Sequence, residues 1–267
     1  MTINEKSRTI AVVNQKGGVG KTTTSVNLAA ALAQSGASVL LVDIDPQGNA
    51  TSGLGIEKNK VTPTVYEAII GNVGIHEAVH STPEIPNLSV APANSRLIGA
   101  EIELTSMLSR ESKLKTALES LKQQYEYIII DCPPSLGLLT VNALTAASTL
   151  LIPIQCEYYA MEGMAQLMTT VKMIKRSLNP TLKIEGVLLT MYDLRTNLSK
   201  EVAREIRKHF ERRVFKIIIP RSVRLSEAPS YGKSIFNYDG RSKGAYAYNQ
   251  LAQEVINNGQ ECIRQRA

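Results

Sequence analysis

The stretch VVNQKGGVGKTTTSVNLAAAL, residues 12–32, constrains the fold of this chain more than any other segment. It leads from a β-branched run through a glycine-rich loop into a helical pattern, which is the setting of a phosphate-binding loop. The usual pattern, G-x-x-x-x-G-K-[ST], ends here in residues 20–22. Its first glycine would fall at position 15, which holds Gln15, and a second lysine, Lys16, follows directly. The stretch therefore predicts a strand–loop–helix unit of an α/β sheet, with an additional lysine at its phosphate site.

Short apolar runs alternate with amphipathic helical patterns along the rest of the chain. Most runs lack polar alternation, as expected for strands that are buried on both faces. The predicted strands are 9–14, 38–45, 88–92, 127–132, 149–154, 184–192 and 214–220, and the predicted helices are 22–35, 95–109, 111–123, 137–147, 160–177, 197–210 and 243–258. This order predicts an α/β fold of the P-loop NTPase type, a doubly wound, mostly parallel sheet with helices on both faces. Since no repeat or linker interrupts the pattern, we expect residues 1–267 to form a single domain.

The glycine-rich loop carries the residue types that phosphate binding needs. Its glycines let backbone N–H groups turn inward around phosphate oxygens, and the start of the next helix adds partial positive charge. Lys21 is expected to reach the β- and γ-phosphates, and the hydroxyl of Thr22 is expected to ligate Mg²⁺. ATP and Mg²⁺ are therefore the expected cofactors. The expected nucleotide-binding residues of this loop are Gly17, Gly18, Val19, Gly20, Lys21, Thr22 and Thr23.

Carboxylates follow two other apolar runs. YIIIDCPPS ends a predicted strand with Asp131, the Walker-B position at which a carboxylate holds Mg²⁺ or its water. LLVDIDPQGN supplies Asp43 and Asp45, which share one face of a strand because side chains alternate with period two. We expect Asp45 to orient or deprotonate the attacking water, while Asp43 either helps to position Mg²⁺ or supports the loop. The expected metal ligands are Thr22, Asp45 and Asp131.

Charge is distributed unevenly along the chain. Residues 1–169 hold 11 Lys and Arg against 15 Asp and Glu, whereas residues 170–267 hold 19 against 9. A basic half indicates a polyanionic partner, although a solvated helix face rich in lysine would give the same count. The polar N-terminus, the lack of any apolar run near the ~20 residues that span a bilayer, and three cysteines without a CxxC pair lead us to expect a soluble, cytoplasmic protein.

Several motifs in order resemble those of the ParA/Soj partition ATPases, the deviant Walker A branch of the P-loop ATPases. They are KGGVGKTTT, DIDPQGNATSGLG, IIIDCPPSLGLLTVNAL, PIQCEYYAMEG and IPRSVRLSEAPSYGKSI, and the resemblance extends from about residue 9 to 257. It implies an ATPase that forms an ATP-bound sandwich homodimer, in which Lys16 contacts the phosphates held by the other subunit. A cation supplied in this way would stabilise the charge that develops during phosphoryl transfer. The expected catalytic residues are therefore Lys16, Lys21 and Asp45.

The same resemblance implies ATP-dependent, sequence-nonspecific binding of double-stranded DNA, association with the nucleoid and stimulation of hydrolysis by a ParB-type partner. Arg195 and Arg224 fall where DNA-contacting arginines of the family lie, and Arg221 is a plausible addition. Pro220 and Ser222 lie in the segment that closes over the adenine in similar proteins, so both are expected to contact the nucleotide.

Two other interpretations remain open. A MinD-like ATPase that cycles on membranes would need an amphipathic C-terminal helix with bulky apolar residues, whereas residues 251–267 carry few of them. We therefore expect no membrane partner. An ATP-switched DNA-binding scaffold whose hydrolysis is incidental would show the same motifs, because the presence of Asp45 does not set a turnover rate.

Overall fold

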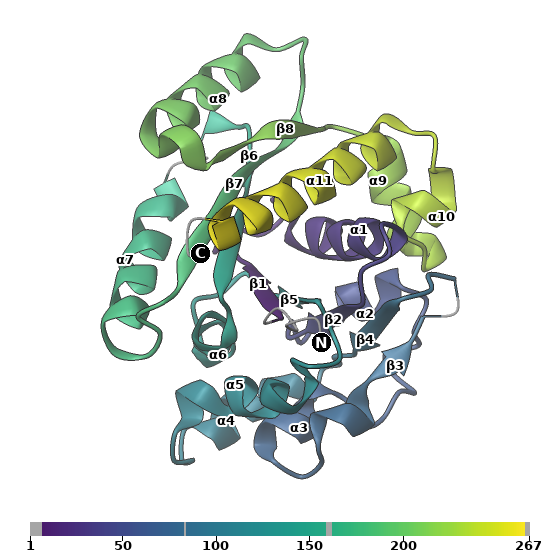
Figure 1. Ribbon diagram of the computed structural model, residues 1–267, viewed down its shortest axis with the longest axis vertical. Coiled ribbons are helices and arrows are strands. Elements are labelled where there is room, and N and C mark those ends of the chain that lie inside the picture. Colours follow the sequence, from purple (N-terminus) through teal and green to yellow (C-terminus); the bar gives the residue numbers. More distant parts are fainter. Residues whose placement is uncertain (1–6, 83, 159–161, 265–267) are drawn as a thin grey trace.

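The strands of the computed structural model form one eight-stranded sheet (Figure 1), and the structure describes residues 7–82, 84–158 and 162–264. The strand order is β3-β4-β2-β5-β1-β6-β7-β8. All neighbouring strands are parallel except β3 and β4 at one edge. The mostly parallel sheet predicted from the apolar runs is thus confirmed. The strands are β1 (Arg8–Val12), β2 (Val39–Asp43), β3 (His80–Ser81), β4 (Leu88–Ala91), β5 (Tyr127–Asp131), β6 (Thr149–Gln155), β7 (Lys183–Tyr192) and β8 (Val214–Pro220).

Helices cover both faces of this sheet, as the sequence predicts (Figure 1). One face packs against α1 (Lys21–Gln34), α2 (Asn49–Gly53), α9 (Val223–Glu227), α10 (Ile235–Asp239) and α11 (Lys243–Arg264). The other packs against α3 (Val65–Ile70), α4 (Leu97–Leu104), α5 (Lys113–Leu118), α6 (Leu138–Ala146), α7 (Glu162–Ser177) and α8 (Asn197–Phe210). Short 3-10 turns lie at Ile75–Ala78, Arg110–Ser112, Glu119–Leu121, Glu211–Arg213 and Ala228–Tyr231.

The central strands show why the apolar runs do not alternate with polar residues. In β1, Ile10 and Val12 belong to the core under α1 and α11, while Ala11 belongs to the core on the opposite face. Both faces are buried, so the residues in the middle of such a strand are apolar without alternation. The chain runs from β1 toward one edge of the sheet to reach β2, and from β5 toward the other edge to reach β6. The loop that leaves β1 therefore lies where the direction of the strand connections changes. Ligands of open α/β sheets bind at this place.

Some predicted helix boundaries are wrong. The helices predicted at 95–109 and 111–123 are shorter, covering 97–104 and 113–118, with 3-10 turns beside the second. The last helix continues past its predicted end at 258 to Arg264, although Asn257, Asn258 and Gly259 suggest an end. Gly259 is a packing residue here and does not end the helix: the guanidinium of Arg8 donates to the carbonyl of Val255 at 2.7 Å and occupies the space that a side chain at Gly259 would need.

The two-residue strand β3 and the helices α2, α3, α9 and α10 were not predicted, since five or six residues are too few for a helical period to be read. The helix predicted from residue 160 begins in part outside the described residues. Within residues 7–82, 84–158 and 162–264, no helix is both long and apolar enough to cross a membrane.

Candidate nucleotide-binding site

The glycine-rich loop joins the carboxyl end of β1 to the start of α1. Gly18 and Gly20 have φ angles of 72° and 87°, in the left-handed region that glycine adopts at low cost. Gly20 caps α1 without a side-chain hydrogen bond to the helix, so the N–H groups of the first turn point toward the mouth of the loop. The carbonyl of Val19 accepts a 2.8 Å hydrogen bond from Thr190 in β7, which fixes the loop to the sheet. This geometry suits an anion such as phosphate.

Gln15, which replaces the first glycine of the usual motif, lies against the start of α7. A Cβ atom on Gly163 would lie 2.8 Å from its Nε2 atom, so a larger residue at that position would displace the Gln15 side chain. Gly17 and Gly18 are exposed, and no atom lies within 4 Å of a Cβ built on either of them. The first residue of the loop therefore packs against the protein, whereas the backbone at Gly17 and Gly18 is accessible from outside.

Lys21 is buried at the centre of the site and is 7% exposed. Its ammonium donates to the carbonyl of Lys16 at 3.0 Å. Burial lowers the pKa of Lys21, while the charges of Asp131 and Asp45 raise it. An ammonium in such surroundings gains most from a nearby anion, as the prediction that it binds phosphate requires.

The Walker-B residue Asp131 is fully buried at the end of β5, opposite Asp43 at the end of β2. Its Oδ1 atom accepts a 2.8 Å hydrogen bond from Ser25, whereas Oδ2 has no partner among the described residues. Burial and then the charge of Asp43 raise the pKa of Asp131 to about 8, and the hydroxyls of Ser25 and Thr22 oppose this shift.

The free oxygen of Asp131 fits a divalent cation. Thr22 lies in the first turn of α1, is half-buried, and its hydroxyl is near enough to Asp131 to affect the pKa of that carboxyl. Mg²⁺ is held in proteins by few side-chain oxygens together with phosphates and water. Thr22 and Asp131 match this requirement, and Thr23 beside them is also half-buried at the helix start.

Asp43 and Asp45 have different surroundings, which removes the ambiguity between them. Asp43 accepts hydrogen bonds from the N–H and hydroxyl of Thr51 at 2.8 and 2.7 Å, and from the N–H of Asp45 at 3.1 Å. Asp43 therefore supports the loop. Asp45 lies beyond the strand, and its Oδ1 accepts the N–H of Gln47 at 2.9 Å, the one hydrogen bond to this side chain among the residues that the structure describes.

The turn after Asp45 has little freedom. Gly48 has a φ of 58°, and a Cβ atom there would lie 2.6 Å from the carbonyl oxygen of Ala93. The hydroxyl of Thr51 also accepts the N–H of Ala93, at 2.9 Å. These contacts hold the turn, and with it Asp45, at the same edge of the sheet as Lys21 and Asp131.

Four buried polar residues that were not among the expected site residues also hold the site together. They are Asn14, Ser25, Thr51 and Thr190, each of which contacts the loop, the Walker-B carboxylate or the Asp45 turn. Asn14, Ser25 and Thr190 bond to partners that are 139, 106 and 171 residues away in the sequence, so the sequence alone cannot assign these contacts.

The segment expected near the adenine lies at the end of β8. Pro220 is the last residue of that strand and pairs with Tyr192 of β7. Ser222 is the N-cap of α9, and its side chain makes no capping bond. Both are half-buried, and no hydrogen bond of the described residues joins either of them to the phosphate loop. Their contact with the nucleotide stays a prediction.

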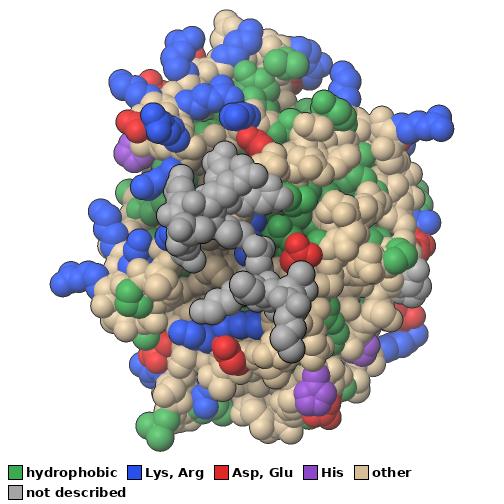
Figure 2. Space-filling model, viewed as in Figure 1, with side chains coloured by type: hydrophobic (Ala, Val, Ile, Leu, Met, Phe, Trp, Pro, Cys, Tyr) green, Lys and Arg blue, Asp and Glu red, His purple; other side chains and the backbone are tan. Residues whose placement is uncertain are grey.

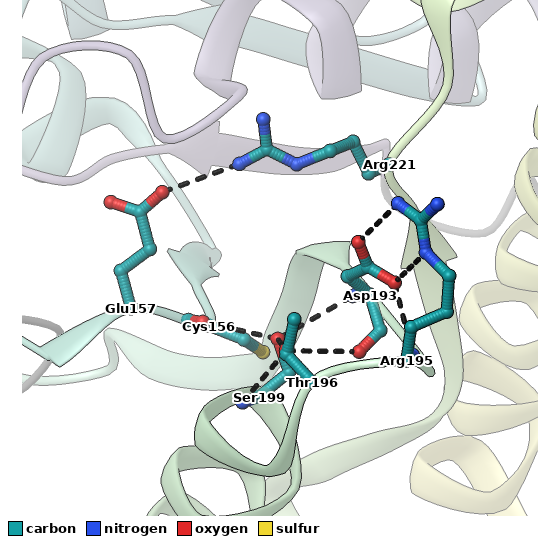
Figure 3. Close-up of polar contacts among 7 residues, drawn as sticks. All are labelled: Cys156, Glu157, Asp193, Arg195, Thr196, Ser199 and Arg221. Carbon is teal, nitrogen blue, oxygen red and sulfur yellow. Dashed lines mark hydrogen bonds and ion pairs between the residues drawn. The ribbon is translucent and has the colours of Figure 1, made fainter.

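The three arginines expected to contact DNA lie near the carboxyl ends of β7 and β8, and each is paired with a carboxylate; Figure 3 shows two of these pairs. Arg195 turns back onto Asp193, with Nε–Oδ1 and Nη2–Oδ2 distances of 2.9 and 2.7 Å. Arg221 reaches Glu157 beyond β6 at 3.3 Å. Arg224 lies in α9 and pairs with Glu227 at 3.1 Å and Asp239 at 3.5 Å.

Further basic residues gather on α8 and the 3-10 turn that follows it. Figure 2 shows Lys and Arg side chains over the part of the molecule that contains α7 and α8. The exposed face of α8 and its following turn carries Lys200, Arg204, Arg207, Lys208, Arg212 and Arg213. The basic half of the sequence therefore presents a basic surface.

Comparison with known proteins links the phosphate site and the basic surface to one group of proteins. A family model described as an AAA domain matches residues 7–184. The chain is 60% identical over 250 residues to the sporulation initiation inhibitor protein Soj of Bacillus subtilis (strain 168), covering 94% of this chain and 98% of that protein. It is 55% identical over 249 residues to the chromosome partitioning protein ParA of Myxococcus xanthus (strain DK1622), covering 93% and 88%.

A solved structure shares the whole architecture. The cobyrinic acid a,c-diamide synthase from Mycobacterium smegmatis, with a bound ATP analogue and magnesium, superposes with a TM-score of 0.85 and 40% sequence identity. The match covers 95% of this chain and 96% of that one.

Proposed function

The chain belongs to the ParA/Soj family of chromosome-partitioning ATPases, with ATP and Mg²⁺ as cofactors, and we propose that ATP switches it between a monomer and a DNA-bound dimer. ATP would join two copies in a sandwich dimer that binds double-stranded DNA without sequence preference. Hydrolysis, stimulated by a ParB-type partner, would release the DNA. The protein would thus act in the partition of DNA and associate with the nucleoid.

The proposed roles at the phosphate site follow from charge and position. Lys21 and the N–H groups at the start of α1 bind the β- and γ-phosphates, because both present positive charge to one buried place. Thr22 and Asp131 hold Mg²⁺, which when bound neutralises charge on the phosphates. Asp45 orients the attacking water and accepts its proton, since one of its oxygens has no hydrogen bond among the described residues.

The geometry of Lys16 carries the proposal of a dimer. Its backbone is held on both sides, since its N–H donates to the Oδ1 atom of Asn14 at 3.0 Å and its carbonyl accepts from Lys21. Within the described part of the chain, its ammonium has no hydrogen bond or ion pair. A lysine with a fixed backbone and an unpaired ammonium, next to open glycines, suits a phosphate that approaches from outside the subunit. ATP binding and dimerisation would then be one linked equilibrium.

The basic surface supports the proposal of nonspecific DNA binding. The exposed cations of α8 begin at Lys200, a few residues after Arg195, and a dimer would carry two such surfaces. Binding through phosphate neutralisation releases counterions and weakens steeply as salt increases. The names of the relatives support a role with chromosomal DNA, and the ParB-type partner is proposed from the family alone.

The test of this function is ATP-dependent dimerisation of a Lys16→Ala variant. In the presence of Mg²⁺ and a non-hydrolysable ATP analogue, light scattering should give a dimer mass for the wild-type protein. Lys16→Ala should bind the analogue but stay a monomer. Lys122→Ala is the matched control. Lys122 is half-buried and pairs with Glu119, and it lies shortly before β5, at the amino ends of the strands and away from the glycine-rich loop. A Lys16→Ala variant that dimerises like the wild type would contradict the proposal.

A further inference from the structure

Asn14 is a buried polar residue between β1 and the phosphate loop, and no part of the loop motif includes it. Its side chain is 5% exposed. The Nδ2 atom donates to the carbonyl of Pro153 in β6 at 2.7 Å, and the Oδ1 atom accepts the N–H of Lys16 at 3.0 Å. Both the donor and the acceptor of the side-chain amide thus form hydrogen bonds within the protein.

The bond to Pro153 continues the hydrogen-bond ladder between β1 and β6. Val13 donates its N–H to the carbonyl of Leu151 at 3.0 Å. In a parallel ladder the next donor would be the N–H of residue 15, and its acceptor would be the carbonyl of Pro153. The chain leaves the strand at this point, and the amide of Asn14 takes the acceptor instead. Asn14 therefore fixes the place at which the loop departs from the sheet.

The bond to Lys16 sets the direction in which the loop continues. A side-chain oxygen that accepts the N–H two residues later forms an Asx turn, which restrains the backbone in between. The other side of Lys16 is held by the ammonium of Lys21 through the Lys16 carbonyl, at 3.0 Å. Lys21 is also the residue that must contact the phosphates of bound ATP. Lys21 must therefore give up its bond to Lys16 in part when ATP binds, whereas the bond from the N–H of Lys16 to Asn14 can remain.

We propose that Asn14 is a positioning residue for Lys16, which it ties to β6 so that the ammonium points out of the subunit. The inference rests on the proposed function, because it concerns the contact that Lys16 makes across the dimer. It predicts that Asn14 contributes to dimerisation and turnover only through Lys16. Both ends of the Asn14 amide are already bonded within the protein, so the inference predicts that the affinity of the monomer for nucleotide does not depend on it.

A double-mutant cycle separates positioning from general support of the fold. The variants are Asn14→Ala, Asn14→Ser, Lys16→Ala and the Asn14→Ala/Lys16→Ala double variant. Asn14→Ser keeps a hydroxyl that can accept the N–H of Lys16 but is too short to reach Pro153. Asn179→Ala is the matched control, because Asn179 is a buried asparagine that bonds the carbonyls of Leu144 and Ala147 at the opposite edge of the sheet.

Three quantities are measured with Mg²⁺: the affinity of the monomer for a fluorescent ATP analogue, the dissociation constant of the analogue-bound dimer, and kcat against KM. Asn14→Ala should raise the dimer dissociation constant about tenfold or more, the effect of losing a buried hydrogen bond. The affinity of the monomer for the analogue should change less than about threefold, whereas kcat at low protein concentration should fall. Asn14→Ser should have a smaller effect, and Asn179→Ala should alter only the melting temperature.

The cycle decides the inference. The residual dimerisation of Lys16→Ala is measured at protein concentrations far above those at which the wild type is a dimer. In this background the change at Asn14 should have no further effect on the dimer dissociation constant, since no ammonium remains to be positioned. Additive effects, or an Asn14→Ala variant that dimerises like the wild type, would overturn the inference while leaving the role of Lys16 intact. Should Asn14→Ala fail to fold, Asn14→Ser takes its place in the same cycle. If Lys16→Ala dimerises like the wild type, both the proposed function and this inference are contradicted.

Discussion

Two buried carboxyl groups, Asp43 and Asp131, face each other at the ends of β2 and β5. Their proximity would be costly if both were ionised, since burial and like charge each favour the protonated form. Asp43 is compensated by its bonds from Thr51, although burial still raises its pKa to about 6. Asp131 has an oxygen without a partner and a pKa raised to about 8. A divalent cation at Asp131 would compensate both the burial and the repulsion.

This arrangement predicts that binding of Mg²⁺ to the ATP complex depends on pH. The pKa of Asp131 is raised, so the carboxyl holds a proton below about pH 8, and Mg²⁺ must displace that proton to bind. The apparent Mg²⁺ affinity should therefore fall as pH decreases below 8, by at most about tenfold per pH unit. Titration of Mg²⁺ into the ATP analogue complex between pH 6 and 9 measures it.

Asp43→Asn provides the control for this prediction. The substitution removes the negative charge that raises the pKa of Asp131, so the pH dependence should move to lower pH. An Mg²⁺ affinity that stays constant from pH 6 to 8 in the wild-type protein would contradict the raised pKa of Asp131 at the metal site.

At this scale the sequence predicts which charged residues gather at one edge, because each of them follows an apolar run or a glycine-rich loop. Lys21, Asp45 and Asp131 all lie at the edge where they were expected. The sequence cannot show that Asn14 bonds to Pro153 or that Thr190 bonds to Val19, since these partners are 139 and 171 residues apart. Their roles appear only after the strands have been brought together.

Among the elements, strands were predicted more accurately than helices. The apolar runs end where polar residues begin, so the strands at 149–154 and 214–220 lie within one residue of β6 and β8. The shorter helices depend on contacts instead. The helix α10, for example, begins at Ile235, whose N–H is accepted by the side chain of Asn27 in α1 at 2.7 Å. A five-residue helix stabilised in this way has no periodic pattern in the sequence.

The turn from β7 to α8 holds a contact that bears on DNA binding. Asp193 accepts the N–H of Arg195 and two bonds from its guanidinium, and these bonds hold the pKa of Asp193 well below its usual range. The carboxylate competes with any DNA phosphate for the same guanidinium. Asp193→Asn should therefore increase affinity for a random-sequence duplex in the ATP state, by about three- to tenfold at low salt.

The effect must come from Arg195 and not from net charge. Glu126→Gln changes the net charge equally, but Glu126 is exposed just before β5 at the opposite edge of the sheet, so its affinity for DNA should stay near that of the wild type. In an Arg195→Ala background, Asp193→Asn should have little effect. If Asp193→Asn and Glu126→Gln bind DNA equally well, Arg195 does not contact DNA. Fluorescence anisotropy at two salt concentrations makes the comparison.

At the scale of the whole molecule, the two halves of the sequence differ in charge and also in position. Residues 1–169 supply β1 to β6, with the glycine-rich loop and the carboxylates proposed to act in hydrolysis, and residues 170–267 supply β7, β8 and α8 with their basic surface. The charge count predicts that a basic surface exists. It does not predict that Arg195, Arg221 and Arg224 are paired with carboxylates, because those pairs form only in the fold. That residues 1–267 form a single domain stays a prediction.

The alternatives differ in what ATP controls. A membrane-cycling ATPase would use the ATP dimer to bind lipid, and a scaffold would bind DNA without needing turnover. In the proposed switch, the phosphate loop, Lys16 and the basic surface act together, so that DNA is bound by the ATP dimer alone and released on hydrolysis.

The most direct test is binding to a random-sequence DNA duplex in moderate salt with Mg²⁺ and ATP, ADP or no nucleotide. The account predicts tight binding with ATP alone, steep weakening as salt increases, and loss of binding in Lys16→Ala. Equal binding in all three nucleotide states, or none in any of them, would contradict the account, because the phosphate site and the basic surface would then act independently.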